Sequence, residues 1–461
     1  MVKTYIALLI IIFFTLCIPF NANSQVPLQV CEVIQITSAD LGSGDPTVCG
    51  NGTGILFSSR ADILNNGHAD QQDLFFADVT DPFNPIFFQL TNTPQGEGRL
   101  SISDDCREIA FNSRSDFVGM NPSNFDQLFS ADISDLNNPS FTQLTNTANN
   151  ASVNGSISGT GTKIALSTSE DITGMNPEGN REYFIFDFNN GVVPFEQLTN
   201  DTSTVGSITS TPIINANGSR VAFTSSENYM PPNSNANGGR ELYLSGIAYN
   251  PPNVPFNTLF QITNFPNNSF RAQGLAFTPD GNTILFGSNA DITGMNSDGN
   301  TDLFVVDVTD PSNPFFTQIT KSEEFTASTG IIDEGGNLVA FITDNQNFVC
   351  GRGGGGDGII LANIANVNNP VFIPLTNFPP GTDLDDLSSP DEFTFIAFES
   401  DSDLIFGNNT DGNDEIYIIF PENCSCFLAA IPTLSEWGLI AMAGILGIVG
   451  FMVIRRRKVA G

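Results

Sequence analysis

Histidine, tryptophan and basic residues are scarce in this sequence. It has one His (His68), one Trp (Trp437), and 16 Lys and Arg against 50 Asp and Glu, so its formal net charge is −34. Five of the basic residues, Lys3 and Arg455–Lys458, are terminal, which leaves 11 (16 − 5) in the body of the chain. We expect no nucleic-acid partner, because phosphate binding needs a basic surface.

The single His limits the catalytic chemistry that the chain can support. Ser-His-Asp and Cys-His mechanisms both need a His as base, and His68 lies in a loop, Asn65–Gln72, as a surface residue. No G-x-S-x-G nucleophile elbow is present. We therefore assign no catalytic residue and no cofactor and expect a protein that is not an enzyme. The alternative is glycoside hydrolysis or elimination by a pair of carboxylates, which needs no His.

Helical periodicity is also missing. Between residues 30 and 425 no stretch has apolar residues spaced at 3.6 over the length of a helix. What recurs is Gln-x-Thr, at intervals of 54 to 64 residues, with one variant copy. The copies are Gln35–Thr37, Gln89–Thr91, Gln143–Thr145, Gln197–Thr199, Gln261–Thr263, Gln318–Thr320 and the variant Pro374–Thr376.

Each repeat has the composition of a small antiparallel sheet. A turn precedes an apolar strand such as Ile284–Phe286, an Asn/Asp/Gly loop follows, and a second apolar strand such as Leu303–Asp307 leads to Gln-x-Thr. A sheet of about four short strands cannot bury both faces alone, whereas radially packed sheets cover each other. The 40 Phe suit such sheet-on-sheet contacts.

The ends of the repeat array are complementary. The first Gln-x-Thr strand, Val33–Thr37, precedes any complete repeat, and the last repeat, ending at Phe420, lacks a Gln-x-Thr of its own. We therefore predict an all-β, seven-bladed β-propeller over residues 25–426, closed by pairing of its N- and C-terminal strands. A cluster of Asp, Glu and Arg at one mouth of its channel would favour an enzyme. A mouth lined by Asn, Ser and Gly would favour binding or coat roles.

The repeat resembles the TolB-type (WD40-like) propeller repeat. Thr278–Phe286 matches the S-P-D-G-x-x-I-A-F core of that family, and Ser103–Asp105 with Ile109–Phe111 is a looser copy. The resemblance covers roughly residues 33–420 and implies the fold, but it says little about function, because such propellers bind many things.

The cysteines and the N-terminus indicate export. An apolar run, Tyr5–Phe20, follows Lys3 and ends in small residues, so residues 1–24 are predicted to be a cleaved signal peptide. Disulfides are then permissible. The predicted clasp places Cys31 near Cys424 or Cys426, and we expect a disulfide there. Cys49 and Cys106 lie in related turns of adjacent repeats and form a second candidate pair.

Between the second and third strands, three loops repeat Asn-x-Asp/Glu-Gly-Asn-x-Asp/Glu. Two interpretations stay open: Asn, Asp and Gly build tight turns, or their oxygens bind Ca²⁺. An acidic residue just before the third strand is also a candidate for pairing between blades. The candidate calcium ligands are Asn176, Glu178, Asn180, Glu182, Asn296, Asp298, Asn300, Asp302, Asn409, Asp411, Asn413 and Glu415.

The C-terminal segment reads as a linker (427–436), a membrane-spanning helix (437–454) and a basic cytoplasmic tail (455–461). The 18 apolar-rich residues span most of a hydrocarbon layer of about 30 Å. Trp437 suits the interface, and the basic cluster belongs on the cytoplasmic side. The propeller is thus predicted to lie outside the inner membrane.

This segment closely resembles the IPTL-CTERM sorting tail, a relative of PEP-CTERM signals. The motif residues are Ile431, Pro432, Thr433, Leu434, Ser435, Glu436, Trp437 and Gly438. The resemblance implies a Gram-negative bacterium, processing by an exosortase-type enzyme, and transfer of the propeller from the inner membrane to the cell surface or matrix. We expect a non-catalytic binding or adhesion scaffold for a surface glycan or protein. The alternatives are a carboxylate-dependent polysaccharide hydrolase or lyase, and a structural coat protein.

Overall fold

The computed structural model describes residues 31–421, with gaps at 39, 68–70, 148–152, 201–209, 230–234, 247–257, 322–329, 344–356, 368, 377, 379–380 and 406. These residues belong to one compact unit, Val30–Cys424. The described residues contain strands and no α-helix, and thus no helix able to cross a membrane. His68, the signal peptide and all residues of the sorting tail lie outside the described residues.

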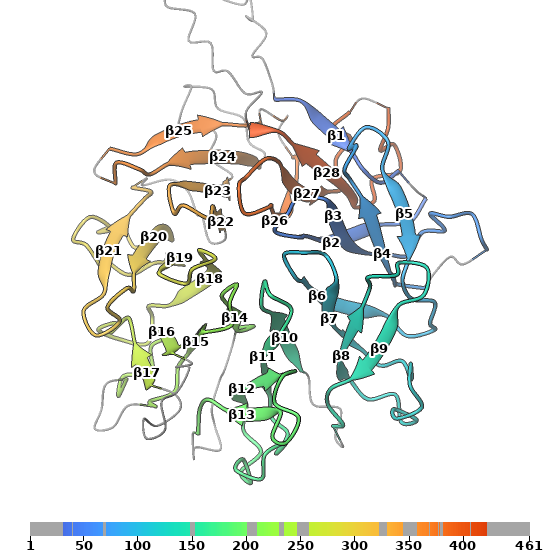
Figure 1. Cartoon of the computed structure of the whole chain (residues 1–461). Coiled ribbons are helices and arrows are strands. Elements are labelled where there is room, and N and C mark those ends of the chain that lie inside the picture. Colours follow the sequence, from blue (N-terminus) through green and yellow to red (C-terminus); the bar gives the residue numbers. More distant parts are fainter. Residues whose placement is uncertain are drawn as a thin grey trace, which may run out of the picture. The chain divides into compact units, whose positions relative to one another are not determined.

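Seven four-stranded antiparallel sheets lie around a central axis like blades (Figure 1). From the channel outward, blade 1 contains β2 (Ser43–Val48), β3 (Gly54–Ser59), β4 (Asp73–Asp78) and β5 (Ile86–Gln89). Blade 2 contains β6 (Glu97–Ile102), β7 (Glu108–Ser113), β8 (Gln127–Asp132) and β9 (Ser140–Gln143). Blade 3 contains β10 (Asn154–Ile157), β11 (Lys163–Thr168), β12 (Glu182–Asp187) and β13 (Phe195–Gln197). Blade 4 contains β14 (Ile213–Ile214), β15 (Arg220–Ser225), β16 (Glu241–Gly246) and β17 (Thr258–Gln261).

The remaining blades follow the same order. Blade 5 contains β18 (Ala272–Phe277), β19 (Thr283–Ser288), β20 (Asp302–Asp307) and β21 (Phe315–Gln318). Blade 6 contains β22 (Gly330–Ile332), β23 (Leu338–Thr343), β24 (Gly358–Asn363) and β25 (Val371–Pro374). Blade 7 contains β26 (Asp385–Ser388), β27 (Ile396–Ser400), β28 (Glu415–Ile419) and, from the other end of the chain, β1 (Val33–Gln35).

The predicted closure of the ring is confirmed. Strand β1 pairs antiparallel with β28, so that Val33 lies opposite Ile419 and Gln35 opposite Tyr417. The backbone N–H of Ile36 also donates to the carbonyl oxygen of Ile416 at 2.7 Å. The first strand of the chain therefore supplies the fourth, outermost strand of the last blade.

The hydrophobic core lies between the blades. The described buried apolar side chains form seven clusters, one for each pair of neighbouring blades, including the pair formed by blades 7 and 1. In five blades an aromatic residue of the second strand stacks on its cross-strand partner in the third, with ring centroids 5.6 to 5.8 Å apart. Large flat rings thus fill the space between sheets, as the Phe content predicted.

The Gln-x-Thr motif has a structural explanation. In every blade the Thr hydroxyl accepts a hydrogen bond from the backbone N–H of the second residue of the third strand, at 2.8 to 3.0 Å. The Thr residues are Thr91, Thr145, Thr199, Thr263, Thr320, Thr376 and Thr37. In blades 1 to 5 the same hydroxyl donates to the side chain that begins the third strand, which is Asp, Glu or Gln. The acidic residue that begins the third strand therefore accepts a hydrogen bond within its own blade. On the sequence alone, this residue was a candidate for pairing between blades.

The ring has two faces. The turn face carries the turns between the innermost and second strands, and the connection face carries the second-to-third-strand loops and the links between blades. At the turn face, backbone hydrogen bonds of 2.8 to 3.1 Å join blade to blade at six junctions. The seventh junction, between blades 5 and 6, falls at Pro279, which has no N–H to donate.

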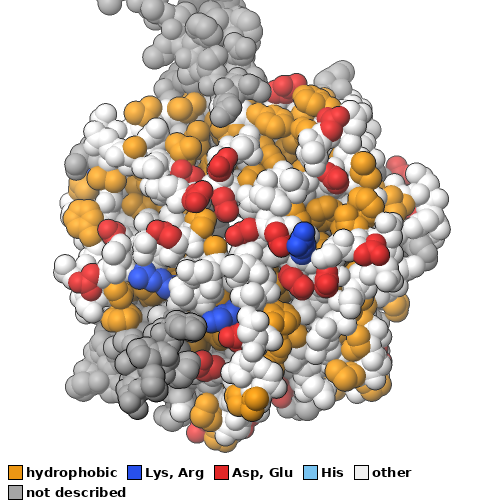
Figure 2. Space-filling model, viewed as in Figure 1, with side chains coloured by type: hydrophobic (Ala, Val, Ile, Leu, Met, Phe, Trp, Pro, Cys, Tyr) orange, Lys and Arg blue, Asp and Glu red, His pale blue; other side chains and the backbone are white. Residues whose placement is uncertain are grey.

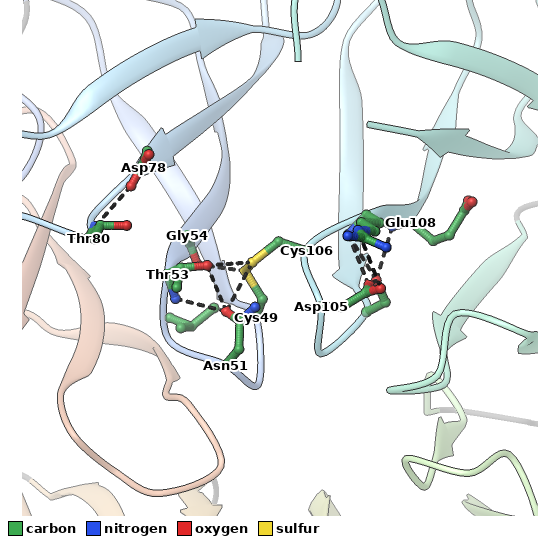
Figure 3. Close-up of a disulfide and its surroundings, with 12 residues drawn as sticks. Cys49, Asn51, Thr53, Gly54, Asp78, Thr80, Asp105, Cys106 and Glu108 are labelled. Carbon is green, nitrogen blue, oxygen red and sulfur yellow. Dashed lines mark hydrogen bonds and ion pairs between the residues drawn. A yellow bond between two sulfur atoms is a disulfide. The ribbon is translucent and has the colours of Figure 1, made fainter. Parts of the chain in front are cut away.

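A disulfide reinforces the turn face between blades 1 and 2. Cys49 and Cys106 are bonded, which confirms this candidate pair, and Figure 3 shows Cys106 reaching from its own turn to that of Cys49. The N–H of Asn51 in the same turn donates to the carbonyl oxygen of Asp104 at 2.9 Å. Cys31 is also disulfide-bonded. Its pairing with Cys424 or Cys426 stays a prediction, because both lie outside the described residues.

Candidate functional site

Four innermost strands contain a β-bulge at the same place, near the connection face. The register shifts after Gly44, Gly98, Gln273 and Asp385. In blade 5 the bulge has a glycine, Gly274, in the left-handed region, whereas blades 7, 1 and 2 place Asp386, Asp45 and Arg99 there, with φ of 49° to 55°. A left-handed backbone costs a non-glycine residue about 1 kcal/mol or more. Bulges commonly re-aim side chains beside functional sites.

These three charged residues line the mouth of the central channel at the connection face. A cavity of about 430 Å³ is bounded by Asp45, Arg99 and Asp386, and reaches Gly155 of blade 3 and Gly330 of blade 6. Because it touches blades on opposite sides of the ring, this cavity is the channel mouth itself. The three side chains are exposed to solvent and therefore accessible to a ligand.

A second cavity of about 550 Å³ adjoins the first, between blades 7 and 1. Its charged lining consists of Asp45, Arg60, Glu399, Asp401 and Asp414. Hydrogen-bonding groups in the lining come from Ser43, Ser58, Ser59 and Gln72. The lining also includes Gly42, Gly44 and Gly412, which contribute no side chain. Both cavities are within the size range of small-ligand sites, but these linings are polar.

Glu399 joins the two blades at this cavity. Its Oε2 accepts a hydrogen bond of 2.7 Å from the backbone N–H of Asp45, and a Cβ on Gly44 would lie 2.5 Å from the same oxygen. Gly44 therefore leaves the room that Glu399 occupies. Burial is the main cause that raises the pKa of Glu399 to about 7. The charges of Asp386, Asp414 and Asp45 contribute to this shift, and the hydrogen bond from the Asp45 backbone opposes it.

The neighbouring carboxyl groups are shifted in the same direction. Partial desolvation raises the pKa of Asp386, although its side chain keeps contact with solvent, and Asp45 and Asp385 add to the effect. Desolvation is the main cause that raises the pKa of Asp385. The negative charges of Asp383, Asp414 and Asp401 add to this shift. This side of the mouth thus holds several carboxyl groups that repel one another.

Several arginines lie on the same face of the ring as this mouth. Besides Arg99 on β6, four arginines flank strand ends at the connection face of blades 2 to 5, namely Arg114, Arg181, Arg240 and Arg271. Burial is the main cause that lowers the pKa of Arg181, and the positive charge of Arg99 adds to this shift. Burial, then the charge of Arg271, lowers the pKa of Arg240, and the two backbones are bridged. Of these five arginines, Arg99 borders the cavity at the channel mouth.

The twelve candidate calcium ligands are divided between the interior and the surface. The first Asn of each loop, Asn176, Asn296 or Asn409, is buried and donates through Nδ2 to the carbonyl oxygen four residues on, at 2.8 to 2.9 Å. The third residues, Glu178, Asp298 and Asp411, are exposed. The last, Glu182, Asp302 and Glu415, are buried at the start of the third strand. Asn180, Asn300 and Asn413 donate to an adjacent acidic side chain.

The loop geometry is that of turns, with one feature that bears on a metal. Among the described residues no three His, Cys, Asp or Glu side chains gather as a metal-binding group. The Oδ1 atoms of Asn176, Asn296 and Asn409 are buried and have no hydrogen-bond partner within the described ranges. Oxygens of this kind suit a hard cation. Calcium binding at these loops stays a prediction.

Sequence reasoning missed the residues of the channel mouth. The left-handed position of these bulges is occupied by Asp45, Arg99 and Asp386, whereas blade 5 has Gly274 there. The arginines had a detectable signal: Arg181 and Arg240 occupy the position just before the third strand, where other blades have Gln72, Asp126 and Asp414. On the face of the ring shown in Figure 2, Asp and Glu side chains predominate over Lys and Arg.

Residues 429–458 match the IPTL-CTERM motif. No curated protein matches the chain in sequence. The fold is similar to that of an oligogalacturonate lyase from Vibrio parahaemolyticus, with a TM-score of 0.57 and 13% identity over 86% of this chain and 95% of that one.

A prolyl endopeptidase gives a TM-score of 0.55 and 13% identity over 85% of this chain and 48% of that one. TolB from Acinetobacter baumannii gives a TM-score of 0.39 and 13% identity over 82% of this chain and 64% of that one. The two structures with TM-scores above 0.5 agree with the propeller fold. Propellers of this kind thus occur in enzymes of different activities, so the fold does not determine the chemistry.

Proposed function

We propose that this chain is an exported, surface-directed propeller that binds a ligand at the channel mouth of its connection face and does not transform it. The IPTL-CTERM motif supports delivery to the surface, with an exosortase-type enzyme as the processing partner and residues 437–454 as a membrane anchor of the precursor. The observation that carries the binding site is the row of Asp386, Asp45 and Arg99. Three consecutive blades hold a charged residue in left-handed backbone beside one cavity.

The non-catalytic role is supported by the environment of Glu399. This half-buried carboxyl has a pKa of about 7, which is the range that a general acid or base requires. Its Oε2 already accepts the backbone N–H of Asp45, and its carboxyl fills the space beside Gly44. It therefore has a structural task in joining blades 7 and 1.

A binding assay tests the proposal. The full chain, purified in detergent, is screened on a glycan array together with Asp386→Asn and with Asp105→Asn, an exposed residue of the turn face that serves as the matched control. We expect specific glycan binding that Asp386→Asn changes and Asp105→Asn leaves intact. Absence of binding to any glycan or surface protein, or equal binding by all three proteins, would contradict the proposal.

A carboxylate-dependent polysaccharide hydrolase or lyase is the second candidate. Asp, Glu and Arg do meet at one mouth, and a carboxyl with a pKa of about 7 stands there beside Asp386, Asp45 and Asp414. This candidate predicts that a bound glycan is shortened with time and that Glu399→Gln stops the reaction while the protein stays folded. Recovery of every bound glycan unchanged would eliminate it.

A further inference from the structure

The methionines of this chain are confined to one kind of loop. The sequence has seven Met, of which one is the initiator and two belong to the predicted membrane-spanning helix. The other four (7 − 3) lie in the loops between the second and third strands of four consecutive blades. They are Met120, Met175, Met230 and Met295, in blades 2, 3, 4 and 5, respectively. We call these four the loop methionines, and Met230 lies outside the described residues.

The described loop methionines do not belong to the hydrophobic core. Methionine is a flexible side chain that commonly fills gaps in cores, yet the seven core clusters of the described residues contain no Met. Met120, Met175 and Met295 instead have exposed fractions of 53%, 54% and 51%. A single exposed apolar side chain is common, but packing does not account for the use of Met at the same place in several blades.

The backbone on both sides of each described loop methionine is fixed. The residue before it is a glycine with a φ of 76° to 78°, a conformation that favours glycine. The residue after it is a buried asparagine, whose Nδ2 donates to a carbonyl oxygen of the same loop at 2.8 to 2.9 Å. The glycines are Gly119, Gly174 and Gly294, and the asparagines are Asn121, Asn176 and Asn296.

Each of these loops also contains an apolar residue that does pack into the ring. It lies three positions before the methionine and contacts a core cluster, as Phe117, Ile172 or Ile292. The loop thus contributes one apolar side chain to the core and leaves the second, the methionine, in solvent. In blade 1 the corresponding loop exposes Leu64 instead, an apolar side chain without sulfur.

An accessible thioether reacts with peroxides and other two-electron oxidants. The sulfur lone pair attacks one oxygen of hydrogen peroxide, the O–O bond breaks, and the proton of the transferred oxygen passes to the leaving hydroxide. The products are a sulfoxide and water, so the sulfur loses two electrons and the peroxide gains two. Among the described residues the cysteines, Cys31, Cys49 and Cys106, are disulfide-bonded and do not compete as thiols.

We infer that the loop methionines are oxidation sites, at which the propeller consumes peroxides, one equivalent at each sulfur, without loss of its fold. The fold is kept because a sulfoxide in solvent forms its hydrogen bonds with water, whereas a sulfoxide in a core would be a buried polar group without a partner. The inference goes beyond the proposed function and does not depend on it. A leucine, such as Leu64, cannot perform this chemistry.

Oxidation of the full chain in detergent tests the inference. Hydrogen peroxide is added, and the mass of each methionine-containing peptide is followed with time beside a short unstructured methionine peptide. The loop methionines should react within about threefold of the rate of that reference, because reactivity follows exposure. The oxidised chain should melt within about 2 °C of the untreated chain. Methionine sulfoxide reductases specific for the two epimers should then restore the original masses.

Two variants separate the loop methionines from the rest of the chain. Replacement of all four by Leu should reduce the peroxide consumed by four equivalents, and Leu64→Met should increase it by one. Reaction of the loop methionines on the order of tenfold or more slower than the reference peptide would overturn the inference, because it would place their sulfurs out of reach. Unfolding of the oxidised chain, or equal consumption of peroxide by the fourfold variant and the wild-type chain, would also overturn it.

Discussion

At the scale of single residues, the recurring threonine is the side chain on which each blade depends. In blade 5, Thr320 accepts the N–H of Leu303 at 2.9 Å and donates to Oδ1 of Asp302 at 2.7 Å. Gln318, from the same motif, donates to the other oxygen of Asp302 at 2.8 Å. Gln and Thr thus recur together because they share one buried carboxylate, which would be costly without hydrogen bonds.

Thr320→Val should destabilise the ring. The valine keeps the shape but leaves a backbone N–H and a buried carboxylate oxygen without their partner, which costs on the order of 1 to 3 kcal/mol. Chemical denaturation of the wild-type and variant chains measures the difference. Thr309→Val, at an exposed position of the same blade, is the control and should change stability little. Equal stability of Thr320→Val and Thr309→Val would contradict the role of the hydroxyl.

Glu97 makes stability depend on pH. It is 2% exposed, and burial raises its pKa to about 8, with the charge of Asp73 adding to the shift and a hydrogen bond from Thr93 opposing it. Because the folded state holds this proton more tightly than the unfolded state, the stability it contributes is complete below the ordinary Glu pKa. That stability is lost as the pH rises through about 8.

Glu97→Gln should therefore reduce the loss of stability between about pH 6 and pH 9, by an amount on the order of 2 to 4 kcal/mol. Denaturation at both pH values, for both chains, gives the comparison. Other carboxyl groups with raised pKa, such as Glu108 and Glu399, titrate equally in the two proteins and cancel. An unchanged pH dependence in the variant would show that Glu97 is ionised in the folded chain at neutral pH.

At the scale of strands and turns, the turn face links blade to blade in a regular pattern. Backbone hydrogen bonds connect successive turns, and Asp104 both accepts from Asn51 and donates to Gly159. A Cβ on Gly159 would lie 2.1 Å from the Asp104 carboxylate, so this position needs a glycine for close approach. The connection face, which we propose as the ligand site, also has backbone hydrogen bonds between blades, such as that from the N–H of Ser43 to the carbonyl oxygen of Asp414 at 2.7 Å.

Replacement of both Cys49 and Cys106 by Ser should lower stability by about 2 to 4 kcal/mol, the usual value for a disulfide that closes a loop of this length. The pair closes 57 residues, from the first blade to the second. Calorimetric melting of the oxidised wild-type chain, the reduced wild-type chain and the double variant gives the measurement. The reduced chain and the variant should melt alike. A variant as stable as the oxidised chain would mean that the backbone hydrogen bonds suffice.

The elements themselves were largely predictable from sequence, and the site was not. Residues such as Ile284–Phe286 and Leu303–Asp307 are short apolar runs between Gly, Asn and Asp, and both lie in strands, β19 and β20. A bulge with left-handed Asp45 or Arg99 leaves no such mark, because the strain is imposed by the surrounding blades. Asp45 and Asp386 lie 341 positions apart in the sequence (386 − 45), and the closed ring brings both to one cavity.

At the scale of the whole molecule, closure of the ring forms the junction beside which the proposed site lies. Pairing of β1 with β28 completes blade 7 and positions Ile36 and Thr37 against Ile416. Blades 7 and 1 share a hydrophobic cluster, as other neighbouring blades do, and the cavity beside Glu399 lies at their junction. The site that we propose thus depends on the closure that the sequence predicted.

Hydrogen–deuterium exchange of the full chain, with and without a saturating concentration of the glycan that the array identifies, measures where the ligand binds. We predict slower exchange at the connection face, in peptides that contain the bulges of β2, β6 and β26. Peptides of the turns at Cys49–Gly54 and Ser103–Glu108 should exchange at unchanged rates. Protection confined to those turns, or the absence of any protection under conditions in which the glycan binds, would contradict a ligand site at the channel mouth.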